Sequence, residues 1–286
     1  MNRIKMNKKI FSFLTVIVAP TAGWLYAHNQ QSAKEFPTAQ EDLIRIKSEN
    51  KMKIEIWSDV MCPFCYIGKA KFDTALQDFA DKNNVEIEWK SFQVMPDLQT
   101  QPGRSIHDIL VEKKRISLAE AKQLNGYATR MGKEVGLTYN FDKAIPANTL
   151  RAHQFQHFAK ANGKGIEAEE VMFKAYFTDG KNIDDINTLL DLGKTIGLNA
   201  DALKKALDGQ TYLPEVQADF REAQQIGVTG VPFFVFNRKY AVSGAQDPKS
   251  FLDVLEKSFA EWRKDHPETK LEIIEGASCK PDGTCE

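Results

Sequence analysis

Residues 53–68 read KIEIWSDVMCPFCYIG, and this stretch decides the fold. Polar and apolar residues alternate over 53–57, which predicts a strand that runs into a loop. Two cysteines, Cys62 and Cys65, follow that loop at once. Apolar residues then recur at helical spacing over 66–82. The order of strand, cysteine pair and helix predicts the opening of a βαβ unit with a pair of thiols at its turn.

The spacing of the two cysteines favours redox chemistry. Cysteines three positions apart at the start of a helix lie on one face, close enough to bridge, and the helix N-terminus stabilises a thiolate at Cys62. Cys65 lies one turn further in, so we expect it to be more buried, protonated and suited to attack a mixed disulfide at Cys62. Pro63 is favourable in a first helical turn, and Phe64 adds no charge, which predicts a moderate rather than an extreme oxidant.

The rest of the chain predicts one sheet interrupted by a long helical segment. Alternation over 85–94 predicts a second strand, and the periodicity over 104–226 is helical, with room for about six helices. Two short apolar runs, at 231–236 and 240–242, flank a turn at Asn237-Arg238 and predict a hairpin. A final amphipathic helix is expected to start at Asp247, with proline in its first turn.

A second motif, GVTGVPFF at 227–234, leads into the predicted hairpin. Its proline, Pro232, cannot donate a hydrogen bond to a sheet ladder. A proline in a loop directly before a strand is a candidate for a cis peptide bond. We therefore expect a cis peptide bond between Val231 and Pro232.

With these motifs the chain resembles the DsbA family of the thioredoxin superfamily, and in particular its FrnE-like branch. The resemblance is carried by SDVMCPFCYIG at 58–68, by Asn148-Thr149 with Ala152-His153, and by GVTGVPFF at 227–234. It implies an α/β protein with a thioredoxin fold and an inserted all-helical domain.

The resemblance also implies an activity, a thiol-disulfide oxidoreductase that exchanges disulfides with protein substrates and needs no cofactor or metal. It implies that Cys62 is the nucleophile, that Cys65 resolves the mixed disulfide, and that Pro232 is the cis-proline. The backbone of Val231 would pair with an extended substrate segment, which fits relaxed sequence specificity. The implied partners are protein thiols or disulfides and a redox recycling partner. Oxidase, isomerase and reductase directions are all compatible with the sequence.

The predicted organisation has five parts: a signal peptide or membrane anchor at 1–27, a polar linker at 28–51, a thioredoxin-like domain from 52–102 and 227–264, a helical insertion at 103–226, and a C-terminal tail at 265–286. Four basic residues precede an apolar run that starts at Ile10, the order of an export signal. The run fits a signal peptide, and residues 10–27 together could anchor the chain in a membrane. We therefore expect export to a bacterial periplasm, whereas translation from Met52 would give a cytoplasmic protein.

Other candidate residues each admit two or more interpretations. Cys279 and Cys285 enclose a Pro-Asp-Gly turn and could form an accessory disulfide, a second redox pair or part of a metal site. Asp59, three residues before the cysteine motif, could transfer a proton during resolution or cap the loop. His153 and His157, one helical turn apart, could ligate zinc, but packing of the insertion against the redox domain is the simpler interpretation.

Several classes of function are disfavoured by the sequence. A formal net charge of -1 gives no overall field for nucleic acid, and no glycine-rich phosphate loop follows a predicted strand. A glutathione-dependent isomerase or transferase of the 2-hydroxychromene-2-carboxylate isomerase or kappa type shares the fold. Those enzymes commonly have serine at the nucleophile position, so the presence of both Cys62 and Cys65 argues against them. A zinc-binding structural module of all four cysteines is disfavoured because the second pair is distant and differently spaced.

Overall fold

The computed structural model describes residues 51–267 of the chain. The predicted leader and the second cysteine pair, Cys279 and Cys285, lie outside the described residues, as does all of the predicted linker except Lys51. None of the described helices is long and apolar enough to cross a lipid bilayer.

The strands of the described region lie near its two ends, most of the helices lie between them, and one helix follows the last strand. The strands are β1 (Met52–Ser58), β2 (Val85–Ser91), β3 (Phe233–Phe236) and β4 (Tyr240–Ser243). Outside the insertion lie α2 (Pro63–Asp78), the 3-10 turn η1 (Lys82–Asn84) and α10 (Pro248–Asp265). The insertion contributes α3 (Ile106–Lys114), α4 (Leu118–Glu134), α5 (Leu150–Ala161), α6 (Gly165–Phe173), the π-helical turn η2 (Lys174–Thr178), α7 (Ile186–Thr195), α8 (Ala200–Asp208) and α9 (Leu213–Gln225).

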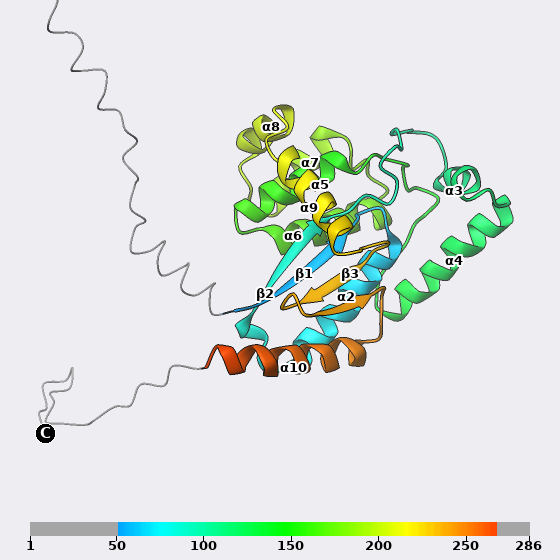
Figure 1. Cartoon of the computed structure of the whole chain (residues 1–286). Helices are drawn as coiled ribbons and strands as arrows, with labels where there is room; N and C mark the ends of the chain where they lie inside the picture. Colours follow the sequence, from blue (N-terminus) through cyan, green and yellow to red (C-terminus); the bar gives the residue numbers. More distant parts are fainter. Residues whose placement is uncertain (1–50, 268–286) are drawn as a thin grey trace, which may run out of the picture. The chain divides into compact units, whose positions relative to one another are not determined.

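The sheet joins segments from the two ends of the described region (Figure 1). Its strand order is β2-β1-β3-β4, with β1 parallel to β2 and antiparallel to β3. The predicted hairpin is confirmed, since β3 and β4 are antiparallel neighbours. Its turn residues Asn237 and Arg238 have positive φ angles of 49° and 52°, and the Lys239 N–H closes the turn on the Phe236 carbonyl at 3.0 Å.

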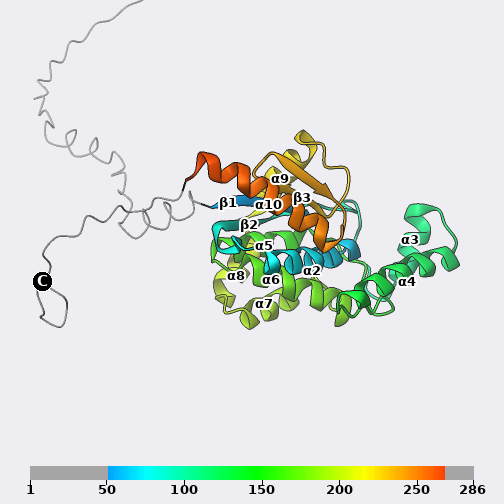
Figure 2. The ribbon, with the colours of Figure 1, turned by 90° about the horizontal axis from the view of Figure 1, so that it is seen from below.

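One face of the sheet is apolar and packs on α2 and α10, which lie side by side beneath it (Figure 2). Alternate residues of β1, Met52, Ile54 and Ile56, are fully buried there because successive strand side chains point to opposite faces. Aromatic rings fill the layer between the sheet and the helices. The ring centroids of Phe234 and Phe251, for example, lie 4.6 Å apart at a steep angle.

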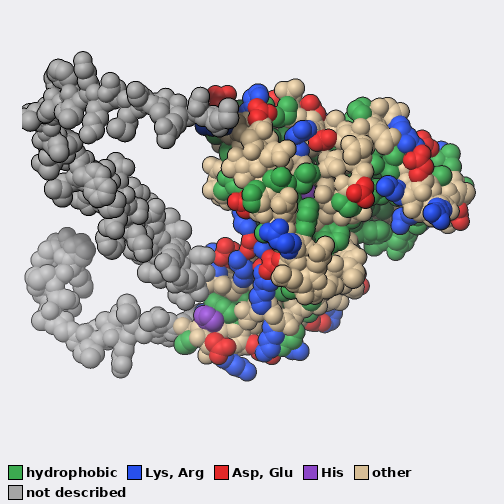
Figure 3. Space-filling view, turned by 45° about the horizontal axis from the view of Figure 1, so that its top comes forward, with side chains coloured by type: hydrophobic (Ala, Val, Ile, Leu, Met, Phe, Trp, Pro, Cys, Tyr) green, Lys and Arg blue, Asp and Glu red, His purple; other side chains and the backbone are tan. Residues whose placement is uncertain are grey.

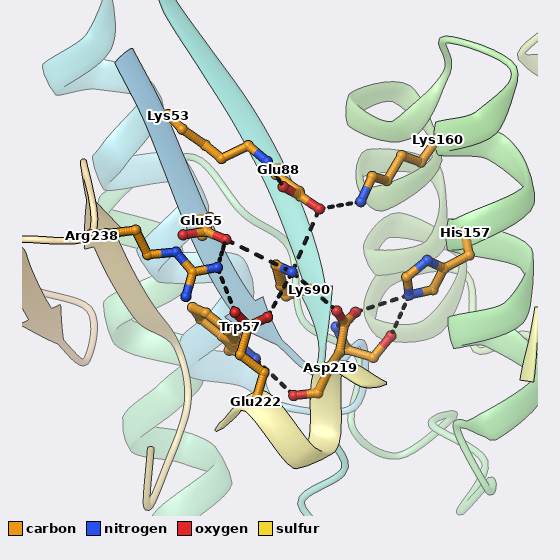
Figure 4. Close-up of polar contacts among 11 residues, drawn as sticks. Lys53, Glu55, Trp57, Glu88, Lys90, His157, Lys160, Asp219, Glu222 and Arg238 are labelled. Carbon is orange, nitrogen blue, oxygen red and sulfur yellow. Dashed lines mark hydrogen bonds and ion pairs between the residues drawn. The ribbon is translucent and has the colours of Figure 1, made fainter. Parts of the chain in front are cut away.

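The opposite face of the sheet is charged and meets the insertion (Figure 4). Lys90 on β2 is central, with its Nζ 2.9 Å from Glu222 Oε2 and 3.3 Å from Asp219 Oδ1, both on α9. Burial raises the pKa of Glu55, and the charges of Arg238 and Lys90 oppose that rise. We call this group the interface ion cluster; it comprises Lys53, Glu55, Glu88, Lys90, His157, Lys160, Asp219, Glu222 and Arg238.

The helix count and some bounds differ from the sequence prediction. Seven α-helices lie between β2 and β3, because the segment expected to be one helix before Gly136 is split into α3 and α4. The break is at Arg115, which has a left-handed backbone (φ 55°), and Ser117 then starts α4 with a capping box to Glu120. The helix expected over 66–82 is α2, which begins at Pro63 and ends at Asp78.

Candidate active site

The two cysteines of the motif lie at the start of α2. Cys62 is the N-cap residue, and the backbone N–H of Cys65 donates to the Cys62 carbonyl at 3.0 Å. Both thiols are free; Cys62 is 8% exposed and Cys65 is 0% exposed. The helix N-terminus is therefore at the more accessible sulfur, and the second sulfur lies beneath it.

The cis-proline loop reaches this pair from the far end of the domain. The Val231–Pro232 peptide bond is cis, as the sequence predicts. The Cys62 thiol donates to the Val231 carbonyl at 3.5 Å, across 169 positions of sequence. Gly68 on α2 makes the approach possible, since a Cβ added there would lie 2.8 Å from Pro232 Cγ. The structure thus brings together Cys62, Cys65, Val231 and Pro232.

The environment of Cys65 disfavours its charged form. Burial raises the pKa of the Cys65 thiol, and the hydrogen bond and charge of Cys62 raise it further. The backbone of Asp59 and the side chain of Ser58 lower this pKa, but by less than burial raises it. The protonated form of Cys65 is therefore favoured.

Asp59 is buried beside the cysteine loop and is 1% exposed. Its carboxylate accepts hydrogen bonds from the backbone N–H groups of Val94 at 2.8 Å and Met61 at 3.3 Å. Burial raises the pKa of Asp59 to about 6, although these backbone hydrogen bonds lower it. The carboxylate thus joins the cysteine loop to the segment that follows β2.

A second buried carboxyl group, Glu169 of α6, was not predicted from the sequence. It is 5% exposed, and its Oε1 accepts a hydrogen bond of 2.8 Å from the Ser58 hydroxyl. Burial raises the pKa of Glu169 to about 7. Ser58 and Glu169 are 111 positions apart, so no local pattern could have paired them.

The two histidines of α5 have separate surroundings. His157 Nε2 lies 2.9 Å from Asp219 Oδ2 and 3.2 Å from the Ser91 hydroxyl, so it joins the insertion to β2, as the packing interpretation predicts (Figure 4). His153 is buried, which lowers its pKa to about 4. Within residues 51–267, no three side chains of the His, Cys, Asp or Glu type are placed to hold a metal ion.

An apolar cavity of about 310 Å³ opens beside Cys62, between the cysteine loop and the arm formed by α3 and α4. Figure 3 shows hydrophobic side chains gathered where this arm meets the rest of the molecule. Val94, Leu124 and Tyr127 are 39–49% exposed and belong to the cavity wall. Among the described residues of that wall, Lys114 is the only lysine, arginine, aspartate or glutamate. The cavity therefore suits an apolar group held close to the Cys62 sulfur.

Known proteins resemble the chain over most of the described region. The DSBA-like thioredoxin domain family matches residues 53–256. YwbO, an uncharacterized protein of Bacillus subtilis, is 30% identical over 213 residues, which cover 74% of this chain and 97% of that protein. A probable DsbA oxidoreductase from Streptomyces coelicolor has a crystal structure that is 33% identical, with a TM-score of 0.68 over 82% of this chain and 98% of that one.

A more distant match shows how widely the fold is shared. A 2-hydroxychromene-2-carboxylate isomerase is 16% identical, with a TM-score of 0.54 over 75% of this chain and 98% of that one. At that identity the likeness concerns the fold alone, because one fold hosts several chemistries. The family match and the two closer relatives are more specific. The chain therefore belongs to the DSBA-like thioredoxin domain family, whose members include thiol oxidoreductases, and it has a thioredoxin fold with a helical insertion.

Proposed function

We propose that this protein exchanges disulfides with polypeptide substrates through Cys62 and Cys65. The observation that carries the proposal is the position of the two thiols at the start of α2, where Cys62 is the N-cap residue and keeps 8% exposure while Cys65 is fully buried. The Val231 carbonyl lies 3.5 Å from the Cys62 sulfur. An extended substrate that paired with the Val231 backbone would be held with its own sulfur beside Cys62.

The exchange needs only the two cysteines and the substrate. In the reducing direction, the Cys62 thiolate attacks one sulfur of a substrate disulfide, and the other substrate sulfur leaves as a thiolate. Cys65 then loses its proton and attacks the Cys62 sulfur, which forms the Cys62–Cys65 disulfide and releases the second substrate thiolate. Two electrons pass to the substrate, whose thiolates take up two protons. Oxidation of a substrate dithiol is the same sequence in reverse.

The cavity beside Cys62 favours a polypeptide substrate over glutathione. Glutathione carries two carboxylates and an ammonium group, so a dedicated site would need several charged or polar partners. The described cavity wall is apolar apart from Lys114, Asn125, the hydroxyl-bearing Tyr127 and Tyr176, and the cysteine motif itself. An unfolded protein would instead supply a backbone for Val231 and an apolar side chain for the cavity.

A trapping experiment tests the proposed function. In Cys65→Ser the mixed disulfide at Cys62 is not resolved, so we expect this full-length variant to accumulate protein adducts that dithiothreitol releases. Cys62→Ser/Cys65→Ser is the matched control and should trap none. Equal trapping by the two variants would reject Cys62 as the nucleophile, because the adducts would then form elsewhere.

The compartment is proposed on the sequence alone. The basic and apolar leader at 1–27 supports export, with or without retention of residues 10–27 as an anchor. Outside the cytoplasm the thiol pair would meet unfolded proteins and a redox partner that recycles it. Fusion of residues 1–50 to a phosphatase that is active only after export should give activity, and an inactive, intact fusion would contradict export.

A further inference from the structure

Tyr139 reaches the cysteine motif from the helical insertion. It lies in the segment between the end of α4 at Glu134 and the start of α5 at Leu150. Its hydroxyl donates to the Pro63 carbonyl, with the two oxygens 2.6 Å apart, across 76 positions of sequence. Pro63 is the first residue of α2 and stands between the two cysteines. The insertion therefore holds the backbone of the redox motif directly.

The surroundings of Tyr139 fix its ring against the rest of the insertion. The ring lies on α4 at Gly132, where an added Cβ would be 2.9 Å from Tyr139 Cε2. Its centroid is 4.7 Å from that of Phe177 and 5.4 Å from that of Phe141. The residue is only 9% exposed. A ring packed in this way leaves the hydroxyl little freedom to turn away from the Pro63 carbonyl.

We propose that Tyr139 is a positioning residue that shifts the exchange equilibrium of the cysteine pair toward its reduced form. It acts through the Pro63 carbonyl rather than on a sulfur atom. The inference rests on the proposed exchange function, and it assigns to the insertion a part in setting how oxidising the pair is.

The hydrogen bond acts on the peptide unit that carries the Phe64 N–H. A donor at the carbonyl of a peptide unit polarises that unit, so its N–H becomes a stronger donor in turn. This N–H belongs to the first turn of α2, and the positive end of the helix lies at the N-cap residue Cys62. The reduced pair gains most from it, because only there can Cys62 carry the charge of a thiolate. Loss of the Tyr139 hydroxyl should therefore make the disulfide more favourable.

Tyr139 remains a hydrogen-bond donor at the pH at which thiols exchange. Burial raises the pKa of its hydroxyl, and negative charge on Cys62, Tyr66 or Cys65 raises this pKa further. The hydroxyl therefore keeps its proton at neutral pH, whichever form the cysteine pair takes.

A titration with glutathione tests this role in the full-length chain, with Cys279 and Cys285 replaced by serine. Two molecules of glutathione reduce the Cys62–Cys65 disulfide to the dithiol and leave as one molecule of glutathione disulfide, so trapped thiols give the equilibrium constant. Tyr139→Phe keeps the ring and removes the hydroxyl. We expect it to favour the protein disulfide by roughly three- to tenfold, the range of a single hydrogen bond. A tenfold change would lower the reduction potential by about 30 mV.

Tyr66→Phe is the matched control for a purely structural effect. Tyr66 belongs to the same core cluster, with its ring centroid 6.1 Å from that of Tyr139, but its hydroxyl donates to Glu170 Oε1 at 2.9 Å. Tyr66→Phe should be less stable to urea, as Tyr139→Phe is, and should keep the wild-type equilibrium with glutathione.

The outcomes separate the role of Tyr139 from the exchange function itself. An unchanged equilibrium in Tyr139→Phe, a shift toward the dithiol, or an equal shift in Tyr66→Phe would each overturn the inference. A wild-type pair that does not equilibrate with glutathione would instead reject the proposed exchange function.

Discussion

At the scale of the residue, one missing Cβ lets the cis-proline loop reach the cysteine helix. A Cβ at Gly68 would lie 2.8 Å from Pro232 Cγ and 3.5 Å from Phe234 Cζ. We predict that Gly68→Ala destabilises the protein by about 1–3 kcal/mol through overpacking. Exchange should also slow, because the Val231 carbonyl would be displaced from Cys62. Urea unfolding and the rate of disulfide exchange measure the two effects.

Gly126 on α4 provides the matched control for that substitution. A Cβ there would meet only Arg130 Nη1, at 3.8 Å. Gly126→Ala should therefore raise stability by up to about 1 kcal/mol, the helix propensity difference, and leave exchange unchanged. If Gly68→Ala changed stability and exchange no more than Gly126→Ala does, the inference that Pro232 packs closely on α2 would be wrong.

The sequence identified those parts of the site that carry a local pattern. Cys62 and Cys65 have a diagnostic spacing, and Pro232 stands directly before an apolar strand, so each could be found without a structure. Glu169 could not, because a glutamate in an amphipathic helix usually faces solvent. Its burial follows from the packing of α6 on β2 and from its contact with Ser58 at the end of β1, which no short window of sequence contains.

At the scale of the element, the interface ion cluster fixes the insertion to the sheet. Asp219 on α9 accepts from the Ser91 backbone N–H at 2.8 Å and also contacts Lys90 and His157. Its side chain is 6% exposed, and its partners are nearly as buried. We predict that Asp219→Ala lowers the free energy of unfolding by about 3 kcal/mol, because the Ser91 N–H and His157 lose their acceptor and Lys90 loses one of its buried carboxylate partners. Urea denaturation measures the change.

Asp191 on α7 serves as the control for the ion cluster. It pairs with Lys194 at 2.9 Å, but its side chain is 67% exposed. Asp191→Ala should leave the free energy of unfolding nearly unchanged, since water screens such a pair. Comparable losses of stability in Asp219→Ala and Asp191→Ala would contradict the prediction that the buried ion cluster stabilises the protein more than an exposed ion pair does.

Element bounds were predictable only where the chain carries a strong signal. The hairpin turn and the proline at the start of α10 were found because their backbone requirements select particular residues. The break between α3 and α4 has no glycine or proline. Its signal is the Ser117–Glu120 capping box, a weaker pattern that is visible in the sequence. The early end of α2 has no such signal, since Phe79 continues the apolar period but has an extended backbone.

At the scale of the whole molecule, the insertion builds the surface that a polypeptide would meet. Leu124 and Leu118 are both 46% exposed on α4, but only Leu124 lines the cavity beside Cys62. We predict that Leu124→Ser slows the reduction of a polypeptide disulfide such as that of insulin, and leaves the reaction with a small aromatic disulfide unchanged. Leu118→Ser should alter neither rate. Equal slowing of the polypeptide reaction by both variants would show that the cavity is not the docking surface.

The fold class follows from the order of elements, but the site depends on the whole molecule. The sheet pairs β1 with β3 across most of the described region, which brings Val231 to Cys62. The insertion then places the cavity wall beside Cys62 and Glu169 against Ser58, at the end of β1. The sequence motifs indicated the cysteine pair and the cis-proline, which come from the two ends of the described region. The contribution of the insertion is visible only in the three-dimensional structure.

The most direct test of the central claim is a redox titration of the full-length protein in glutathione buffers, with free thiols trapped and located by mass spectrometry. We predict that Cys62 and Cys65 convert together between dithiol and disulfide in one reversible transition. Its slope should be that of a two-electron couple, about 30 mV for a tenfold change in the equilibrium constant. If both cysteines stayed reduced in the most oxidising buffers, or converted separately, the assignment of an exchange pair at the start of α2 would be wrong.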